Sequence, residues 1–207
     1  MVRNVRIYSS SFVEFYRSQE PKVQQKIEFV IDLIRYERAG PAKFFKRLRD
    51  TEGLYEVRVI TPHKSIRTLC FLDEGNSVVL TNGFIKRHKK PQKSKLPRHN
   101  DVEMNTTPTN KKTNIISFEE LIEDKYGTLG TPSREKFETD ALAFRLGVML
   151  KEARKAANLT QEELALRTGT KKSYISRIER GLSDIQMSTY FKLIEIGLGK
   201  RLNISIA

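Results

Sequence analysis

The sequence predicts an α+β protein in two parts, a small twisted antiparallel sheet with two helices followed by an all-α domain of five helices. Three observations support this fold class. Residues of β type crowd into positions 54–85, apolar residues recur at helical spacing after position 141, and a stretch nearly free of apolar residues lies between. The expected organisation is a first domain at 1–96, a linker at 97–114, an acidic segment at 115–140 that faces the first domain, and a second domain at 141–207.

The first domain opens with a short alternating strand, "VRNVRIY", and with a helix after the serines of "SSSFVEFYRSQ". A second helix should begin near Pro21 and stop at Gly40 and Pro41. Its apolar positions at helical spacing are Val23, Ile27, Val30, Ile31 and Ile34. The runs "LYEVRVI", "SIRTLCFL" and "SVVLTNGFI", joined by "TPHK" and "DEGN", predict three strands. The expected order is therefore β-α-α-β-β-β.

The charge of the chain points to a polyanionic partner. The formal net charge is +13, and residues 1–103 carry 21 Lys and Arg against 12 Asp and Glu. Such an excess favours nucleic acid over a membrane surface. The single cysteine, Cys70, cannot form an internal disulfide, and three histidines make a poor ligand set, so we expect no metal and no cofactor. No apolar run reaches the roughly 18 residues of a membrane span, which predicts a cytoplasmic location without membrane contact.

The stretch "LTQEELALRTGTKKSYISRIERG", residues 159–181, has the spacing of a helix-turn-helix. Small Ala165 allows the second helix to cross closely, and Gly169 accepts the backbone angles of the turn. Ile175 and Ile178 would anchor the second helix to the core. Thr160 should cap the first helix, with the side chain three residues later completing a capping box.

The opposite side of this second helix carries the candidate DNA-binding residues. Arg177 can pair with a guanine edge, and Lys172 can reach guanine or phosphate. Gln161 could hold a phosphate together with the helix N-terminus. The full candidate set is Gln161, Thr170, Lys171, Lys172, Ser173, Ser176 and Arg177. The alternative is a helical hairpin whose basic face is only solvated.

On these residues, the span 142–199 resembles the Xre/Cro-like repressor domain. The resemblance implies a five-helix fold that binds a palindromic operator as a dimer.

The first domain resembles the RelE-like toxin superfamily in its β-α-α-β-β-β order, its two strand arginines and its lysine-rich continuation. "FFKRLRDTEGLYEVRV" followed by "NGFIKRHKKPQ" resembles the HigB branch, and the second half, with "TLGTPSREKFE", resembles the HigA antitoxin. The resemblance implies mRNA cleavage on the ribosome by the first part and neutralisation of that activity by the second. A natural fusion, an engineered joining and two cistrons written as one are all compatible with the sequence.

RNA cleavage needs no metal, because the 2′-hydroxyl is the nucleophile. It needs a proton acceptor, cations for the pentacovalent phosphorane, and a proton for the leaving oxygen. Arg58 and Arg67, within apolar strands, suit the phosphate, while Lys86 and His88 could close the same site. The candidate catalytic residues are Arg58, Arg67, Lys86, His88 and Glu56, and the RNA-binding residues are Lys46, Arg47, Lys89 and Lys90. The alternative for the strand arginines and for His88 is a solvated surface residue, and for the run Lys86–Lys95 it is a tail that only tracks RNA.

Glu56 departs from the RelE pattern, which tends to place a basic residue there. It could act as general base, or form a structural ion pair with Arg58 or Lys46. The two resemblances together imply a toxin–antitoxin module in one chain, with the enzyme inhibited and the second domain repressing its own operator. The alternative is a non-enzymatic helix-turn-helix regulator whose basic first domain binds RNA or an effector.

Overall fold

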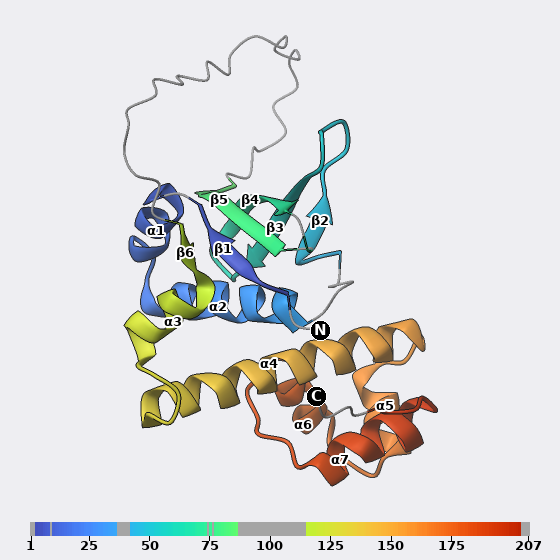
Figure 1. Cartoon of the computed structure of the whole chain (residues 1–207). Coiled ribbons are helices and arrows are strands. Elements are labelled where there is room, and N and C mark those ends of the chain that lie inside the picture. The colour runs from blue at the N-terminus through green and yellow to red at the C-terminus, as the bar shows by residue number, and fades with distance from the viewer. Residues whose placement is uncertain are drawn as a thin grey trace, which may run out of the picture.

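The computed structural model describes residues 3–8, 10–36, 42–73, 75, 77–86 and 115–203. These residues form a sheet with helices on one side, continued by a helical domain, so the predicted α+β class is confirmed (Figure 1). No helix in these ranges is long and apolar enough to cross a bilayer.

The sheet has six strands in the order β2-β3-β4-β5-β1-β6. They are β1 Val5–Ile7, β2 Phe45–Arg47, β3 Leu54–Ile60, β4 Ser65–Asp73, β5 Ser77–Ile85 and β6 Ile116–Ser117. The three strands expected between positions 54 and 85 are confirmed. The sheet is antiparallel as predicted at every pairing except one, because β1 runs parallel to β5. The two helices after β1 carry the chain across the sheet, which leaves β1 beside the last strand of the first domain.

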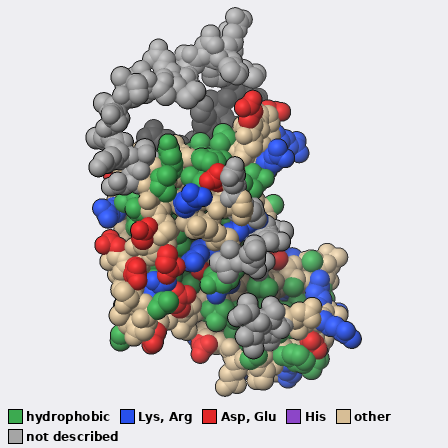
Figure 2. Space-filling view, viewed as in Figure 1, with side chains coloured by type: hydrophobic (Ala, Val, Ile, Leu, Met, Phe, Trp, Pro, Cys, Tyr) green, Lys and Arg blue, Asp and Glu red, His purple; other side chains and the backbone are tan. Residues whose placement is uncertain are grey.

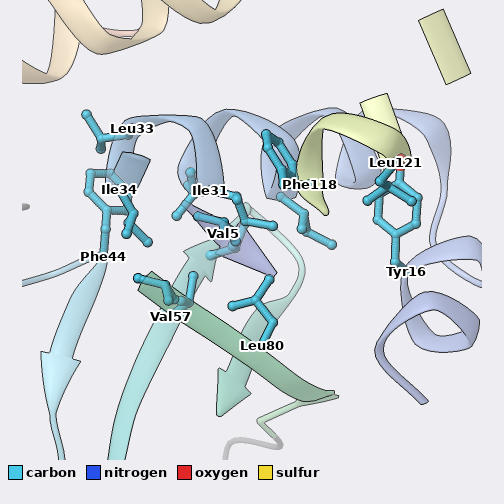
Figure 3. Close-up of a cluster of buried hydrophobic side chains, with 14 of the residues drawn as sticks. Val5, Tyr16, Ile31, Leu33, Ile34, Phe44, Val57, Leu80, Phe118 and Leu121 are labelled. Carbon is cyan, nitrogen blue, oxygen red and sulfur yellow. The ribbon is translucent and has the colours of Figure 1, made fainter. Parts of the chain in front are cut away.

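Two helices, α1 Ser10–Arg17 and α2 Pro21–Tyr36, cover one face of this sheet (Figure 1). The apolar side chains of α2 that were expected at helical spacing are all buried. Ile31 and Ile34 meet Val57 and Leu80 of the sheet in the first core (Figure 3). This face is therefore closed by packing and leaves only the other face of the sheet for a ligand.

The residues after the linker complete the first domain. Strand β6 pairs antiparallel with β1, and helix α3, Phe118–Tyr126, follows it directly. Ser117 and Glu120 form a capping box at the start of α3. Phe118 and Leu121 are buried in the same core as Val5 and Ile31 (Figure 3). The hydrophobic core of the first domain thus includes side chains from both sides of the linker.

Helix α4, Pro132–Ala156, belongs to both domains. Its first half lies along α2, where the Phe29 ring packs against Phe137 and Phe144 with ring centroids 5.9 and 5.7 Å apart. Its second half contributes Leu150 to the core of the second domain. The boundary expected between residues 140 and 141 therefore falls inside an unbroken helix, because the hydrophobic stripe of α4 serves two cores in succession.

The second domain continues with α5 Gln161–Arg167, α6 Lys172–Ile178, α7 Met187–Phe191 and a π-helical segment, η2, Lys192–Gly197. Together with α4 these make the five helical elements that were expected. Its core is formed by Leu150, Leu164, Ile175, Ile178, Tyr190 and Leu193. Buried packing therefore holds α5 and α6 firmly against α4.

Candidate nucleic-acid sites

The face of the sheet away from α2 carries the predicted strand arginines. Val57 and Val59 point into the core, so Glu56 and Arg58, which alternate with them, lie on the other face. Arg58 and Arg67 are directly opposite each other in the β3–β4 ladder. We call this side, with Glu56, Arg58, Arg67, Phe84 and Lys86, the outer face.

Glu56 links the two arginines. Arg58 Nε donates to Glu56 Oε1 at 2.5 Å, and Arg67 Nε lies 3.2 Å from the same oxygen. Arg67 is only 8% exposed, and its guanidinium also donates to the carbonyl of Ile66 at 3.0 Å. Of the two pairings considered for Glu56, the structure shows the one with Arg58, while no ion pair to Lys46 occurs among the described residues. Both strand arginines are thus held in place by one carboxylate.

The remaining candidates of the first domain lie around this pair. Lys86 is exposed just after β5, beside the end of β4, where its N–H donates to Ser65 O at 2.7 Å. Lys46 is exposed opposite Glu56 on β2, at the edge of the outer face. Arg47 is exposed too, but it pairs with Tyr55 and so belongs to the other side of the sheet. His88, Lys89 and Lys90 lie outside the described residues.

Phe84 is a member of the outer face that sequence reasoning missed. It lies directly opposite Arg67 on β5 and is 40% exposed. An exposed ring on the strand next to Arg67 is suited to stack on a nucleobase. The signal was present in the run "SVVLTNGFI", but only the register of β4 with β5 shows that this ring lies beside Arg67.

The helix-turn-helix has the predicted geometry. The Thr160 side chain accepts from the Glu163 N–H while the Glu163 side chain accepts from the Thr160 N–H, which confirms the capping box. Ala165 is buried at the crossing, and Gly169 adopts φ +60° in the turn. Ile175 and Ile178 are buried in the core, leaving the opposite side of α6 to solvent.

Most of the predicted DNA-binding side chains are on that solvent side. Lys171, Lys172, Ser173 and Arg177 are exposed, while Gln161, Thr170 and Ser176 are partly exposed. Lys172 Nζ lies 2.8 Å from Glu162 Oε2 in a solvent-exposed pair, which is weak enough to exchange for a phosphate. Arg177 has no ion-pair partner in the described part of the chain. Three of these residues, Lys171, Lys172 and Arg177, place exposed positive charge on or beside α6.

Gln161 differs from its expected role. Its side-chain amide donates to Glu179 Oε2 at 2.8 Å and so points toward the protein. Glu179 is buried and is also held by Arg154, with Nε 2.5 Å from Oε1. Burial alone would raise the pKa of Glu179, but hydrogen bonds from Arg154 and Gln161 lower it below its ordinary value. This buried ion pair, which sequence reasoning missed, fastens α4 to the end of α6.

Acidic and basic side chains are mixed on the face of the molecule shown in Figure 2. The segment 115–140 contacts the first domain through charges of both signs. Its carboxylates reach basic groups of the first domain, with Glu119 3.3 Å from Arg35 and Asp124 3.6 Å from Arg17. One of its two lysines, Lys125, instead lies 2.6 Å from the fully buried Glu28 of α2. The contact is therefore not a simple pairing of an acidic segment with a basic surface.

The chain matches two family models. Residues 14–101 match the family described as phage derived protein Gp49-like, and residues 150–196 match the family described as helix-turn-helix. The chain joins a Gp49-like domain to a helix-turn-helix domain.

Among solved structures, the restriction-modification controller protein C.AhdI from Aeromonas hydrophila is 31% identical over 31% of this chain and 91% of that chain, with a TM-score of 0.30. No curated protein matches the chain. The Gp49-like match includes every residue of the outer face, and the helix-turn-helix match includes all of α5 and α6. Within the described ranges, no group of three or more His, Cys, Asp or Glu side chains could hold a metal ion.

Proposed function

We propose that the chain is a toxin–antitoxin module of the HigB–HigA kind. In this proposal the Gp49-like domain is a metal-independent endoribonuclease that cleaves mRNA on the ribosome. The helix-turn-helix domain binds a palindromic operator as a dimer, represses transcription and keeps the nuclease inactive. The observation that carries the proposal is the outer face, where Arg58 and Arg67 lie side by side next to an exposed aromatic ring.

The residues of the outer face supply the groups that RNA cleavage requires. Two guanidinium groups on adjacent strands can bind the oxygens of one phosphate and stabilise the charge that develops in the phosphorane. Glu56 already accepts a hydrogen bond from Arg58, so a carboxylate is in place to take the 2′-hydroxyl proton. Phe84 would stack on the neighbouring base, and Lys86 would contact the leaving side of the phosphate. His88 stays the candidate proton donor.

The helices of the C-terminal part contact the first domain on α2 and at the β1 edge, away from the outer face (Figure 1). In the proposal, inhibition is therefore steric, because the docked domain restricts the approach of the ribosome with its mRNA. It does not come from side chains inserted between Arg58 and Arg67. A short free RNA would still reach the outer face of the full chain.

The test compares translation in a cell-free extract with the full chain and with fragment 1–100. We expect the fragment to stop translation and to cut mRNA, and the full chain to do neither. The fragment lacks β6 and α3, so circular dichroism must show that it is folded. A folded fragment that leaves translation and transcripts intact would defeat the proposal.

Substitutions in the fragment identify the site. Arg67→Ala should abolish cleavage, whereas Arg47→Ala removes an equal charge on the other side of the sheet and should retain most of it. Glu56→Gln separates the two roles considered for that residue. If Glu56 is the general base, the substitution should lower the rate of RNA cleavage by about 100-fold or more. If Glu56 only positions the two arginines, the substitution should change this rate little.

A second function is favoured by one observation. The carboxylate of Glu56 contacts both guanidinium groups, so both cations already have an anionic partner. The alternative is therefore a non-enzymatic helix-turn-helix regulator whose first domain binds RNA or an effector without cleaving it. Binding of RNA to folded fragment 1–100 without any cut product would establish this alternative.

A further inference from the structure

A cavity of about 890 Å³ opens between the two domains. Its walls come from α2, from the residues just before β2, from the β3–β4 turn, from the second half of α4 and from the residues that follow α6. None of its lining residues belongs to the outer face, and those of the second domain lie before α5 or after α6. It is therefore a separate site from both nucleic-acid sites.

The rim of this cavity is strongly cationic. The basic side chains that line it are Lys22, Lys26, Lys43, Lys64, Lys151, Lys155 and Arg180. The acids among the described lining residues are Glu20 and Glu179, and both already have cationic partners, Lys64 at 3.2 Å and Arg154 at 2.5 Å. Lys22, Lys26, Lys151 and Lys155 have no carboxylate within ion-pair distance among the described residues. An anion bound in the cavity could form ion pairs with these four lysines.

The floor of the cavity is apolar and aromatic. Phe44 and Phe144, which contact each other with ring centroids 6.1 Å apart, line it together with Val23 and Val148. Lys26 Nζ lies 3.9 Å from the centroid of the Phe144 ring, where the cationic rim meets this floor. Burial, together with the nearby charges of Lys43 and Lys151, lowers the pKa of Lys26 to about 8. A bound anion would therefore stabilise the charged form of Lys26.

We propose that this cavity binds a nucleotide, with its phosphates among the lysines of α2 and α4 and its base against the phenylalanine floor. A cavity of this size lies within the range of about 300–1,000 Å³ that is usual for small-molecule sites, which often lie between domains. Because its walls come from both domains, a bound nucleotide stabilises their docked arrangement. The inference does not depend on RNA cleavage by the outer face.

The test uses the full chain, ATP as the probe and isothermal titration calorimetry. We expect ATP to bind at least about tenfold more tightly than either tripolyphosphate or adenosine, because each of these lacks one half of the contacts. Lys26→Gln and Lys151→Gln should each weaken ATP binding about tenfold. Lys136→Gln is the matched control, since Lys136 is exposed on the first half of α4 and does not line the cavity.

A second readout follows the proton on Lys26. Above its pKa, near pH 8.5, an incoming phosphate should favour the charged amine, so binding takes up a proton in the wild-type chain but not in Lys26→Gln. Comparison of the binding heats in two buffers of different ionisation enthalpy measures this uptake. Equal affinity for tripolyphosphate and ATP, an equal loss in Lys136→Gln, or no binding at about 1 mM ATP would each overturn the inference.

Discussion

Glu28 of α2 is fully buried, and the ammonium of Lys125, from the other side of the linker, lies 2.6 Å from its Oε1. Two hydroxyls complete the site, because Tyr126 donates to Oε2 at 2.6 Å and Tyr16 donates to Oε1. Burial, with the adjacent carboxylate, raises the pKa of both tyrosines. The first domain thus relies on the second part of the chain to neutralise a charge in its own interior.

Lys125→Met should therefore destabilise the chain. The buried carboxylate of Glu28 would keep its hydrogen bonds from the two tyrosines but lose its cation. We expect the unfolding free energy to fall by about 2–3 kcal/mol, as measured by urea denaturation. Adding Glu28→Gln should restore most of the loss. The control is Lys136→Met, which removes an exposed i,i+4 pair and should change stability by no more than about 0.5 kcal/mol. A double variant no more stable than Lys125→Met would contradict the explanation.

Asp32 should make stability depend on pH. Burial raises the pKa of this carboxyl to about 6, against the opposing effects of Arg145 and Arg35. The folded state therefore keeps a proton up to about pH 6 that the unfolded chain releases near pH 4. The contribution of Asp32 to stability therefore falls as pH rises between these values, by up to about 3 kcal/mol, and then levels off.

The measurement is the unfolding free energy from pH 4 to pH 7 for the wild type and for Asp32→Asn. The variant should lose this decline. Asp140→Asn, in an exposed pair on α4, should keep it. If the curves of the wild type and of Asp32→Asn run parallel, Asp32 is not the titrating group.

Gly147→Ala should damage the helix-turn-helix more than Gly83→Ala damages the first domain. An added Cβ at Gly147 would lie 2.1 Å from the carbonyl oxygen of Ile178, so α6 would have to move. At Gly83 it would lie 2.2 Å from the Phe15 ring, a side chain that can rotate. We expect a loss of about 2–3 kcal/mol for the first and about 1 kcal/mol for the second, by thermal unfolding. Similar losses would show that the backbone contact is not the cause.

Arg177→Ala should abolish specific operator binding and leave the fold intact. The side chain is exposed, and in the proposed operator complex its loss removes a contact to a guanine edge worth about 1–3 kcal/mol. Gel-shift titrations on the operator and on a scrambled site measure this. Lys136→Ala, an equal loss of charge on the first half of α4, should bind like the wild type. Unchanged operator affinity in Arg177→Ala would remove α6 from the interface.

Elements that are marked by long sequence patterns could be predicted, and elements marked by only a few residues could not. The β-type runs at 54–60, 65–72 and 77–85 each extend over seven to nine residues and are separated by turn residues, so those strands could be predicted. Strand β6 has only two residues, and its pairing with β1 is decided by tertiary contact. That α3 supplies Phe118 to the first core was likewise beyond sequence reasoning, because an amphipathic helix does not reveal which domain it covers.

The same holds within the sites. Alternation placed Glu56 and Arg58 on one face, but the contact of Glu56 with Arg67 depends on the β3–β4 register. The spacing of the helix-turn-helix predicted which isoleucines are buried. It could not predict that Gln161 turns toward Glu179, since that acid lies 18 residues further along the chain and is brought close only by the fold.

The single helix α4 has 25 residues and hence a length of roughly 37 Å. Because it enters both cores without a break, α4 itself places no hinge between the two domains. In the proposed dimer on a palindromic operator, the two sheets would consequently be held at a spacing dictated by the DNA, as rigid arms of one scaffold.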